Sequence, residues 1–243
     1  MCGRYSLSSE AYDSFIEFKD MGYPFQVPSR FNIAPTQPVA VIRLKGSDLD
    51  QAILPDAPLP PREGALMRWG LIPHFAKEIM TDRPLINARS ETIAGKPSFR
   101  GPFRRRKCLV PADGFYEWKR GGASPIPYHI CLQDRKPFTF AAIWEAWTGP
   151  AGEDWLETVS LVTKPANGSV KKIHHRSPVI IAPEDYDLWL RPADPPDPKI
   201  FQKLSCEIDE KLEIYEVSPF VNNVRNDNET CIKPATTDQF KLF

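Results

Sequence analysis

The sequence predicts an α+β fold built around a curved, mostly antiparallel sheet, with a few helices at its periphery. Two observations lead to this prediction. Short apolar runs typical of strands outnumber helical patterns, and the 243 residues include 26 prolines, roughly twice the usual share. Because proline can neither donate to a sheet ladder nor continue a helix, it favours many short elements joined by rigid loops. The chain shows neither a flexible linker nor an internal repeat, so we expect a single domain over residues 1–243.

The first predicted element is a helix over residues 9–18, capped by Ser8 or Ser9. Strands are expected at 39–44, 65–72, 157–163 and 212–217. KCLVPADGFYEWKR (107–120) predicts a strand, a turn at 111–114 and a second strand, and YHICLQDRKPFTFAAIWEAW (128–147) predicts a hairpin turning at 133–136. Pro183 suits the first turn of a helix over 184–190, and another short helix is expected after Pro198.

Charge and cysteine usage exclude several classes of protein. The 31 basic and 31 acidic residues give a net charge of zero, which argues against a non-specific nucleic-acid coat but permits a local basic groove. Such grooves are suggested by the basic stretches 100–107 and 171–176. No run is long enough for a membrane span, and five scattered cysteines without a C-x-x-C pair indicate reduced thiols. We therefore expect a cytoplasmic protein without membrane contact, metal or cofactor, in which Cys108 and Cys131 are core residues.

The first six residues, MCGRYS, place a cysteine where processing can expose it. Removal of Met1 would leave Cys2 with a free α-amine and a thiol on adjacent carbons, whose pKa values ordinarily lie near ~8 and ~8.5. A terminal amine can also act as a base for its own side chain. Gly3 permits close approach to the backbone, and Arg4 adds a cation. The alternative is that Cys2 merely packs.

Glu117, in DGFYEW, alternates with aromatic residues. A strand would place Phe115, Glu117 and Lys119 on one face and Tyr116 and Trp118 on the other. Rings beside the carboxylate would desolvate it and raise its pKa toward a value useful for acid–base chemistry. From these residues alone, however, an ordinary exposed glutamate paired with Lys119 is the better interpretation.

Three further segments hold polar or aromatic candidates. The histidines of KKIHHRSPVII lie beside a basic residue and indicate a pocket suited to phosphate. The asparagine of PLINARSET could orient a substrate or the terminal amine, or simply cap a turn. The aromatic residues of RWGLIPHF could stack on bases or fill the core. The residues concerned are His174, His175 and Arg176; Asn87, Arg89 and Glu91; and Trp69, His74 and Phe75.

Taken together, these segments resemble the SOS-response-associated peptidase (SRAP) family, whose members process abasic sites. The matching blocks occur in the family's order over nearly the whole chain: MCGRYS, FNIAPTQ, MRWGLIPHFAKE, PLINARSETIAGKPSFR, RRRKCLVPADGFYEWKR, IHHRSPVII and VNNVRND. The resemblance implies a single α+β domain whose sheets form a pseudo-barrel. It also implies a monomer that binds abasic single-stranded DNA and seals the lesion by a covalent thiazolidine link through its N-terminal cysteine.

The resemblance further implies roles for individual residues. Cys2 is the nucleophile, Asn87 holds its amine, Glu117 is the general acid/base, and His174 assists at the adjacent phosphate and in reversal of the link. Other implied DNA contacts are phosphate-binding arginines, residues lining the path of the strand, and a loop that wedges against bases: Arg4, Arg89 and Arg176; Asn32, Pro35 and Thr163; His74 and Phe75.

Three other classes remain open. An N-terminal-nucleophile glutamine amidotransferase also begins Met-Cys-Gly, although Tyr5 and Ser6 replace the glycine-rich continuation expected there. A thiol peptidase could use Cys2, Glu117 and His174, at least on its own leader. A non-catalytic DNA-binding module would need none of these groups.

Overall fold

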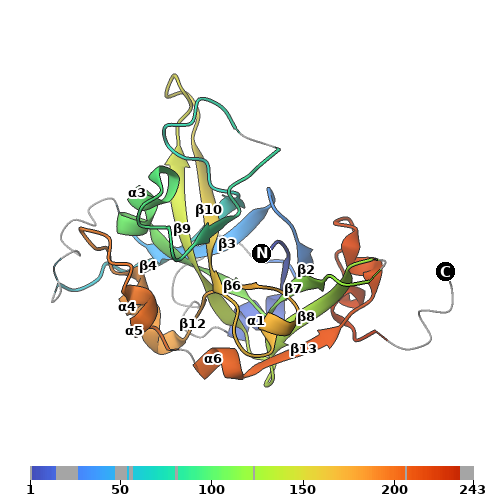
Figure 1. Ribbon diagram of the computed structural model, residues 1–243. Helices are drawn as coiled ribbons and strands as arrows, with labels where there is room; N and C mark the ends of the chain where they lie inside the picture. Colours follow the sequence, from blue (N-terminus) through green and yellow to red (C-terminus); the bar gives the residue numbers. More distant parts are fainter. Residues whose placement is uncertain are drawn as a thin grey trace.

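The computed structural model describes residues 2–14, 27–46, 54, 57–79, 82–122, 124–205 and 207–235 (Figure 1). Five strands form a closed ring: β3 (Pro38–Leu44), β4 (Arg62–Trp69), β6 (Lys107–Ala112), β9 (Phe138–Trp147) and β10 (Leu156–Pro165). Pairing runs from β10 through β4, β3, β6 and β9 and returns to β10. Only the β4–β10 pair of the ring is parallel. The ring confirms the predicted α+β pseudo-barrel with mostly antiparallel sheets.

Three short strands extend the barrel. They are β5 (Asn87–Arg89), β11 (Arg176–Pro178) and β12 (Ile180–Ile181). Thr163 of β10 pairs with both Arg89 and Pro178, so β5 and β11 lie on opposite edges of β10. The C-terminal half of β10 therefore brings the 87–91 and 174–178 segments to the same end of the barrel.

A second sheet has five antiparallel strands in the order β13 (Leu212–Glu216), β8 (Ile126–Leu132), β7 (Gly114–Lys119), β1 (Tyr5–Leu7) and β2 (Arg30–Ile33). The strand that follows Cys2 is thus an interior strand of this sheet, between β7 and β2. In Figure 1 the start of the chain lies between the barrel and this sheet.

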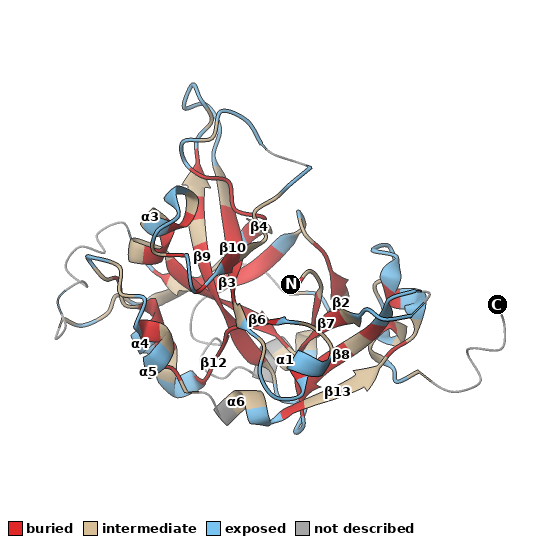
Figure 2. Ribbon diagram, viewed as in Figure 1, coloured by how far each residue is buried: buried red, intermediate tan, exposed pale blue. Residues whose placement is uncertain are grey.

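Two apolar clusters hold these layers together. The first joins the two sheets, with Tyr5 and Phe115 from one and Val110, Phe140 and Leu161 from the other. The second lies under the helices α3 (Pro97–Arg105), α4 (Tyr186–Leu190) and α5 (Ile200–Lys203). Figure 2 shows the strands mostly buried and the peripheral helices exposed on their outer sides. The other described α-helices are α1 (Ser9–Ser14) and α6 (Glu207–Glu210).

The prediction of a hairpin over 128–147 is wrong. Its two strands, β8 and β9, form in nearly the predicted places, but β8 pairs with β7 and β13 whereas β9 pairs with β6, β10 and β12. The turn at 133–136 therefore carries the chain from one sheet to the other, with Arg135 at a positive φ of 60°. Its amide at Gln133 donates to the Lys211 carbonyl before β13, which holds the turn on the five-stranded sheet.

Residues 107–120 make a similar change of sheet, with β6 in the barrel and β7 in the second sheet. The strand–turn–strand prediction gave too long a turn, because Pro111 and Ala112 belong to β6 and Asp113 alone separates the strands. Pro111 is tolerated because β3 pairs only with Cys108 and Leu109, so Pro111 lies beyond that pairing.

The other expected elements form with shifted ends. The strand expected at 65–72 is β4, which ends at Trp69 because Gly70 has a φ of 125° and a Cβ there would lie 2.9 Å from that of Pro84. The strands at 39–44, 157–163 and 212–217 and the helices near 184–190 and after Pro198 are confirmed. The helix expected over 9–18 is α1 as far as Ser14, and its remainder lies outside the described residues.

Helix α3 was not expected, because Pro102 and a run of basic residues obscure its apolar face of Phe99 and Phe103. Cys108 and Cys131 are buried, as predicted. No helix among the described residues is long and apolar enough to cross a membrane.

Candidate active site

Cys2 lies three residues before the start of β1, and its side chain is fully buried. The thiol donates to the carbonyl of Arg4 at 3.7 Å, and the Cys2 carbonyl accepts from Nδ2 of Asn87 at 2.9 Å. Burial, with the charge of Glu117 as a second cause, raises the pKa of the thiol far above its ordinary value. The thiol is therefore protonated at neutral pH and becomes a good nucleophile only if a neighbouring base removes its proton.

Glu117 reaches Cys2 from the neighbouring strand β7. Tyr5 pairs with Phe115, and extending this antiparallel register by two residues places Glu117 opposite Gly3. The Glu117 residue is only 3% exposed, and its burial raises the pKa of the carboxyl group to about 7. A group with this pKa can both accept and donate a proton near neutral pH.

His174 approaches Glu117 from the segment before β11. Its Nδ1 lies 3.7 Å from Oε1 of Glu117 and 3.0 Å from the backbone nitrogen of Arg176. Because a backbone N–H can only donate, we assign Nδ1 as the acceptor and place the ring hydrogen on Nε2. Burial lowers the pKa of His174, which favours this neutral form.

Arg176 is buried two residues after His174. Its Nη1 and Nη2 donate to the two carboxylate oxygens of Glu91, and Nη2 also donates to the carbonyl of Thr163 at 2.6 Å. Thr163 is itself buried. Arg89, two residues before Glu91 on β5, is exposed.

Arg4 and Asn32 form a second network on the far side of Cys2. Nη1 of Arg4 donates to Oδ1 of Asn32 at 2.7 Å and to the carbonyl of Val221 at 3.0 Å. The buried Asn32 amide donates to the carbonyls of residues 221, 223 and 226, which fixes the VNNVRND segment against β2. The guanidinium of Arg4 also lies 5.9 Å from the centre of the Trp118 ring.

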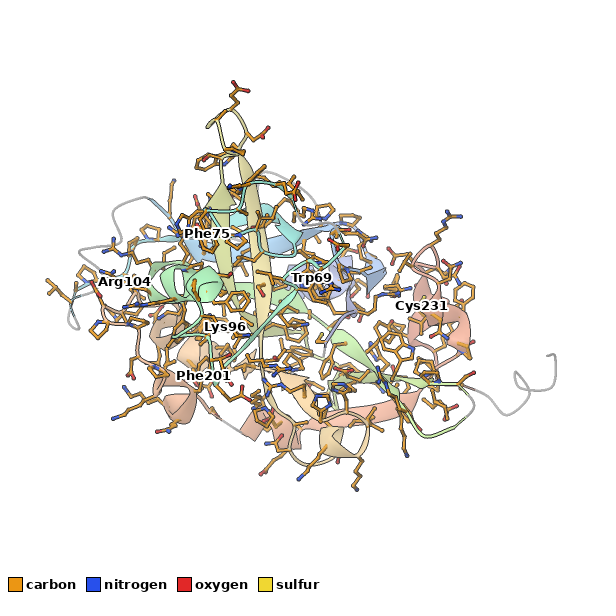
Figure 3. The ribbon with its side chains drawn as sticks, turned by 45° about the horizontal axis from the view of Figure 1, so that its top comes forward. Trp69, Phe75, Lys96, Arg104, Phe201 and Cys231 are labelled. Carbon is orange, nitrogen blue, oxygen red and sulfur yellow. The ribbon has the colours of Figure 1, made fainter. Side chains whose placement is uncertain are left out.

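The aromatic candidates differ in exposure. Trp69 is fully buried, its ring 5.5 Å from that of Tyr5 and its Nε1 donating to the Ile86 carbonyl at 3.0 Å. Figure 3 shows Trp69 among packed side chains near the middle of the molecule, with Phe75 apart from it. Trp69 thus fills the core, the alternative that the sequence left open.

His74 and Phe75, by contrast, are exposed, and the Phe75 residue is 56% accessible. Their loop is anchored where Nε1 of Trp147 donates to the Ala76 carbonyl at 2.7 Å. Pro35 is half-buried in the turn before β3.

The structure thus groups the four predicted residues: Asn87 binds the Cys2 carbonyl, His174 lies 3.7 Å from Glu117, and the charge of Glu117 acts on the Cys2 thiol. The residues predicted to contact DNA fall into two groups. Four are buried and bind other parts of the protein, and five reach the surface at least in part: Asn32, Trp69, Thr163 and Arg176; Arg4, Pro35, His74, Phe75 and Arg89. DNA contacts by any of these residues remain predictions.

Two residues at the site received no role from the sequence. Glu91 holds Arg176, and Nε1 of Trp118 donates to Oδ1 of Asn222 at 2.7 Å beside Arg4. A signal for Glu91 existed, since an acidic residue in NARSET can pair with the arginine of HHRSP. The described part of the chain holds no group of three or more histidine, cysteine or acidic residues able to bind a metal ion.

A separate cluster resembles a serine hydrolase triad only in composition. The hydroxyl of Ser6 donates to Asp113 at 2.5 Å and lies 3.1 Å from Nε2 of His129. Asp113 contacts the serine and Ser6 is fully buried, so neither an oriented base nor an accessible nucleophile is present. Burial lowers the pKa of His129 to about 3, and we assign this cluster a structural role.

Comparison with known proteins shows which family and which individual proteins this chain resembles. A family model described as SOS response associated peptidase (SRAP) matches residues 1–224. Abasic site processing protein YoqW of Bacillus subtilis is 38% identical over 237 residues, covering 96% of this chain and 99% of that protein. Abasic site processing protein HMCES of Gallus gallus is 34% identical over 191 residues, which cover 69% of this chain and 56% of the Gallus gallus protein.

Solved structures share the fold. An X-ray structure of a protein from Bacteroides thetaiotaomicron superposes with a TM-score of 0.65 at 25% identity, covering 96% of this chain and 93% of its own. Another, from Bordetella bronchiseptica, gives a TM-score of 0.70 at 24% identity, covering 89% of this chain and all of its own.

Proposed function

Because the chain belongs to the SOS response associated peptidase family, we propose that it captures abasic sites in single-stranded DNA by a covalent link to Cys2. The observation that carries the proposal is the grouping of Cys2, Asn87, Glu117 and His174 at the junction of the two sheets. The proposal requires removal of Met1, by an aminopeptidase or by the protein itself, so that Cys2 bears the free α-amine.

The first step is formation of an imine. The open-chain sugar of an abasic site is an aldehyde, and the α-amine of Cys2 adds to its carbon. Loss of the carbonyl oxygen as water leaves a C=N bond. Glu117, with a pKa of about 7, donates a proton to the departing oxygen, while Asn87 holds the Cys2 backbone by its carbonyl.

The second step closes the ring. The sulfur of Cys2 adds to the imine carbon and the thiol proton is transferred to nitrogen, which gives a thiazolidine without any oxidant or reductant. Because the thiol pKa is raised, Glu117 in its ionised form is the base that removes this proton. Both reactive groups belong to one residue, so the second step gains the full advantage of proximity.

Binding of the strand is assigned to the exposed and half-buried cations around this site. The described partners of the Arg4 guanidinium are neutral oxygens of Asn32, Val221 and Asn222, so its charge is available to a phosphate. Arg89 is exposed on β5. Phe75 and His74 would stack against bases beside the lesion. His174 would act mainly in reversal, protonating the leaving group through Nε2.

The proposal is tested by measuring intact mass after incubation with abasic single-stranded DNA, combined with denaturing gels. The native protein should lack Met1 and gain the mass of the DNA less one water. Cys2→Ala retains an amine and should give only a borohydride-trapped imine with some nicked DNA. Cys131→Ala, which removes a different buried thiol, is the matched control.

A heat-stable link formed by Cys2→Ala at the native rate would exclude Cys2 as the nucleophile. Retention of Met1 in protein that still cross-links would exclude the thiazolidine. Release of ammonia from glutamine would instead indicate an amidotransferase.

A further inference from the structure

Glu91 lies beside the catalytic cluster, yet the proposed function gives it no role. It follows β5 by two residues, and its carboxylate receives both terminal nitrogens of Arg176, with Nη2 to Oε2 at 2.9 Å. The Ser90 hydroxyl donates to the same carboxylate at 3.0 Å. The hydrogen bonds from Arg176 lower the pKa of Glu91 to about 2, so the pair is ionic throughout the neutral range.

The Arg176 side chain is thereby held on two sides. Glu91 binds one edge of the guanidinium, while Thr163 accepts from Nη2 through its carbonyl at 2.6 Å and its hydroxyl at 3.2 Å. The backbone of Arg176 pairs with Pro165 at the end of β10. The ion pair therefore joins the loop after β5 to β11 across β10.

The backbone of Arg176 in turn controls the ring of His174. Its N–H lies 3.0 Å from Nδ1, and its carbonyl oxygen lies 3.2 Å from the same atom. With Nδ1 as the acceptor, the ring is neutral and its hydrogen is on Nε2. With the hydrogen on Nδ1, the ring would instead donate to the carbonyl oxygen of Arg176. The position of the Arg176 backbone relative to Nδ1 therefore bears on which ring nitrogen of His174 carries the hydrogen.

We infer that Glu91 is a positioning residue for the proposed reaction: by holding Arg176, it keeps the hydrogen of His174 on Nε2, the nitrogen that donates during reversal of the link. The inference has two halves. The geometric half states that Glu91 keeps the hydrogen of His174 on Nε2, and it can be tested without DNA. The catalytic half states that this hydrogen is used in reversal of the link, and it rests on the proposed function.

The geometric half is tested by two-dimensional NMR of protein with ¹⁵N-labelled histidine rings. The chain has four histidines, and the spectrum of His174→Asn identifies the signals of His174. At pH 7 the native protein should show an unprotonated Nδ1 and a protonated Nε2. Glu91→Gln should show averaged shifts of the two nitrogens, Glu91→Asp should restore much of the native pattern, and the control Glu184→Gln on the exposed 3₁₀ turn before α4 should change nothing.

The catalytic half is tested by measuring formation and reversal of the cross-link separately. In Glu91→Gln we expect reversal to slow by about tenfold, a part of the factor that general acid–base catalysis supplies, with formation within twofold of native. The pH profile of reversal should also shift upward, because the Nδ1-protonated ring gains a carbonyl acceptor. A purely structural role would slow both steps and leave the profile in place.

Native tautomer populations in Glu91→Gln would overturn the inference whatever the kinetics. A changed tautomer with unchanged reversal would overturn its catalytic half. Tighter binding of DNA by Glu91→Gln would overturn it in another way, by showing that Glu91 competes with phosphate for Arg176. Failure of the native protein to cross-link would refute the proposed function and the catalytic half together, while the NMR result would still decide the geometry.

Discussion

Replacing Glu117 with glutamine should make the protein more stable at alkaline pH while removing its activity. Glutamine has the shape of the protonated acid but never ionises. In the folded protein the carboxyl pKa is about 7, against 4.5 for an ordinary glutamate. Below pH 4.5 Glu117 is protonated in both the folded and the unfolded chain, so it does not reduce the free energy of unfolding.

Between pH 4.5 and 7 the unfolded chain releases this proton while the folded chain keeps it, so the stability of the native protein falls as pH rises. Above pH 7 the loss is complete. The shift from 4.5 to about 7 then corresponds to about 3 kcal/mol, at about 1.4 kcal/mol per pKa unit. Glu117→Gln should therefore exceed the native protein in unfolding free energy by about 3 kcal/mol at pH 8 and by little at pH 4.

The assay is urea unfolding at pH 4, 6 and 8, followed by fluorescence of the six tryptophans. Cross-linking by the same variant should slow by roughly a hundredfold or more, since the proton carrier is lost. Glu184→Gln, in which an exposed carboxylate is changed, should show no pH-dependent difference. Equal stability of Glu117→Gln and native protein at pH 8 would refute the raised pKa, and retained activity would refute the acid–base role.

Three further predictions concern other residues. Burial lowers the pKa of His129 to about 3, so below pH 6.5 the unfolded chain takes up a proton at this residue while the folded chain does not. The free energy of unfolding should therefore fall by about 2 kcal/mol because of His129 between neutral pH and pH 5. In urea unfolding, a difference between native protein and His129→Gln that does not change with pH would contradict this. Arg4→Gln and Arg89→Gln should each reduce the slope of log affinity against log salt by about 0.7 for single-stranded DNA, measured by fluorescence anisotropy; unchanged slopes would remove these residues from the interface. Phe75→Ala should weaken non-covalent binding of single-stranded DNA about tenfold through lost stacking, whereas Trp155→Ala, which removes another exposed aromatic side chain, should not; equal losses in both would argue against a specific wedge.

The fold was predictable at the level of strands but not of their partners. The runs that form β3 and β10 are rich in apolar and β-branched residues, which locates these strands well. The two changes of sheet, at Asp113 and at residues 133–136, look in sequence like ordinary turns. Local turn chemistry shows where a strand ends, whereas the sheet that receives the next strand is decided by packing between distant residues.

At the site, the residues alone favoured an exposed Glu117 paired with Lys119, and this interpretation was wrong, because Glu117 is buried. The acid–base role of Glu117 came from the resemblance, which also named the three residues grouped with it. Exposure was not predictable. An arginine such as Arg176 looks like a phosphate ligand in sequence, and only the contacts with Glu91 and Thr163 show that its two terminal nitrogens already have partners. Likewise, the sequence cannot show that Trp69 faces inward, because either face of β4 would accept it.

The interior position of β1 has a consequence for the timing of biosynthesis. Cys2 precedes in the chain the residues that complete its folded surroundings, from Asn87 to the Val221 carbonyl that binds Arg4. The surroundings of Cys2 are therefore incomplete until Val221 has been synthesised, and the proposed removal of Met1 would have this interval available. If Met1 is removed at that stage, as the proposed function requires, the folded protein need not open its five-stranded sheet to expose the amine of Cys2.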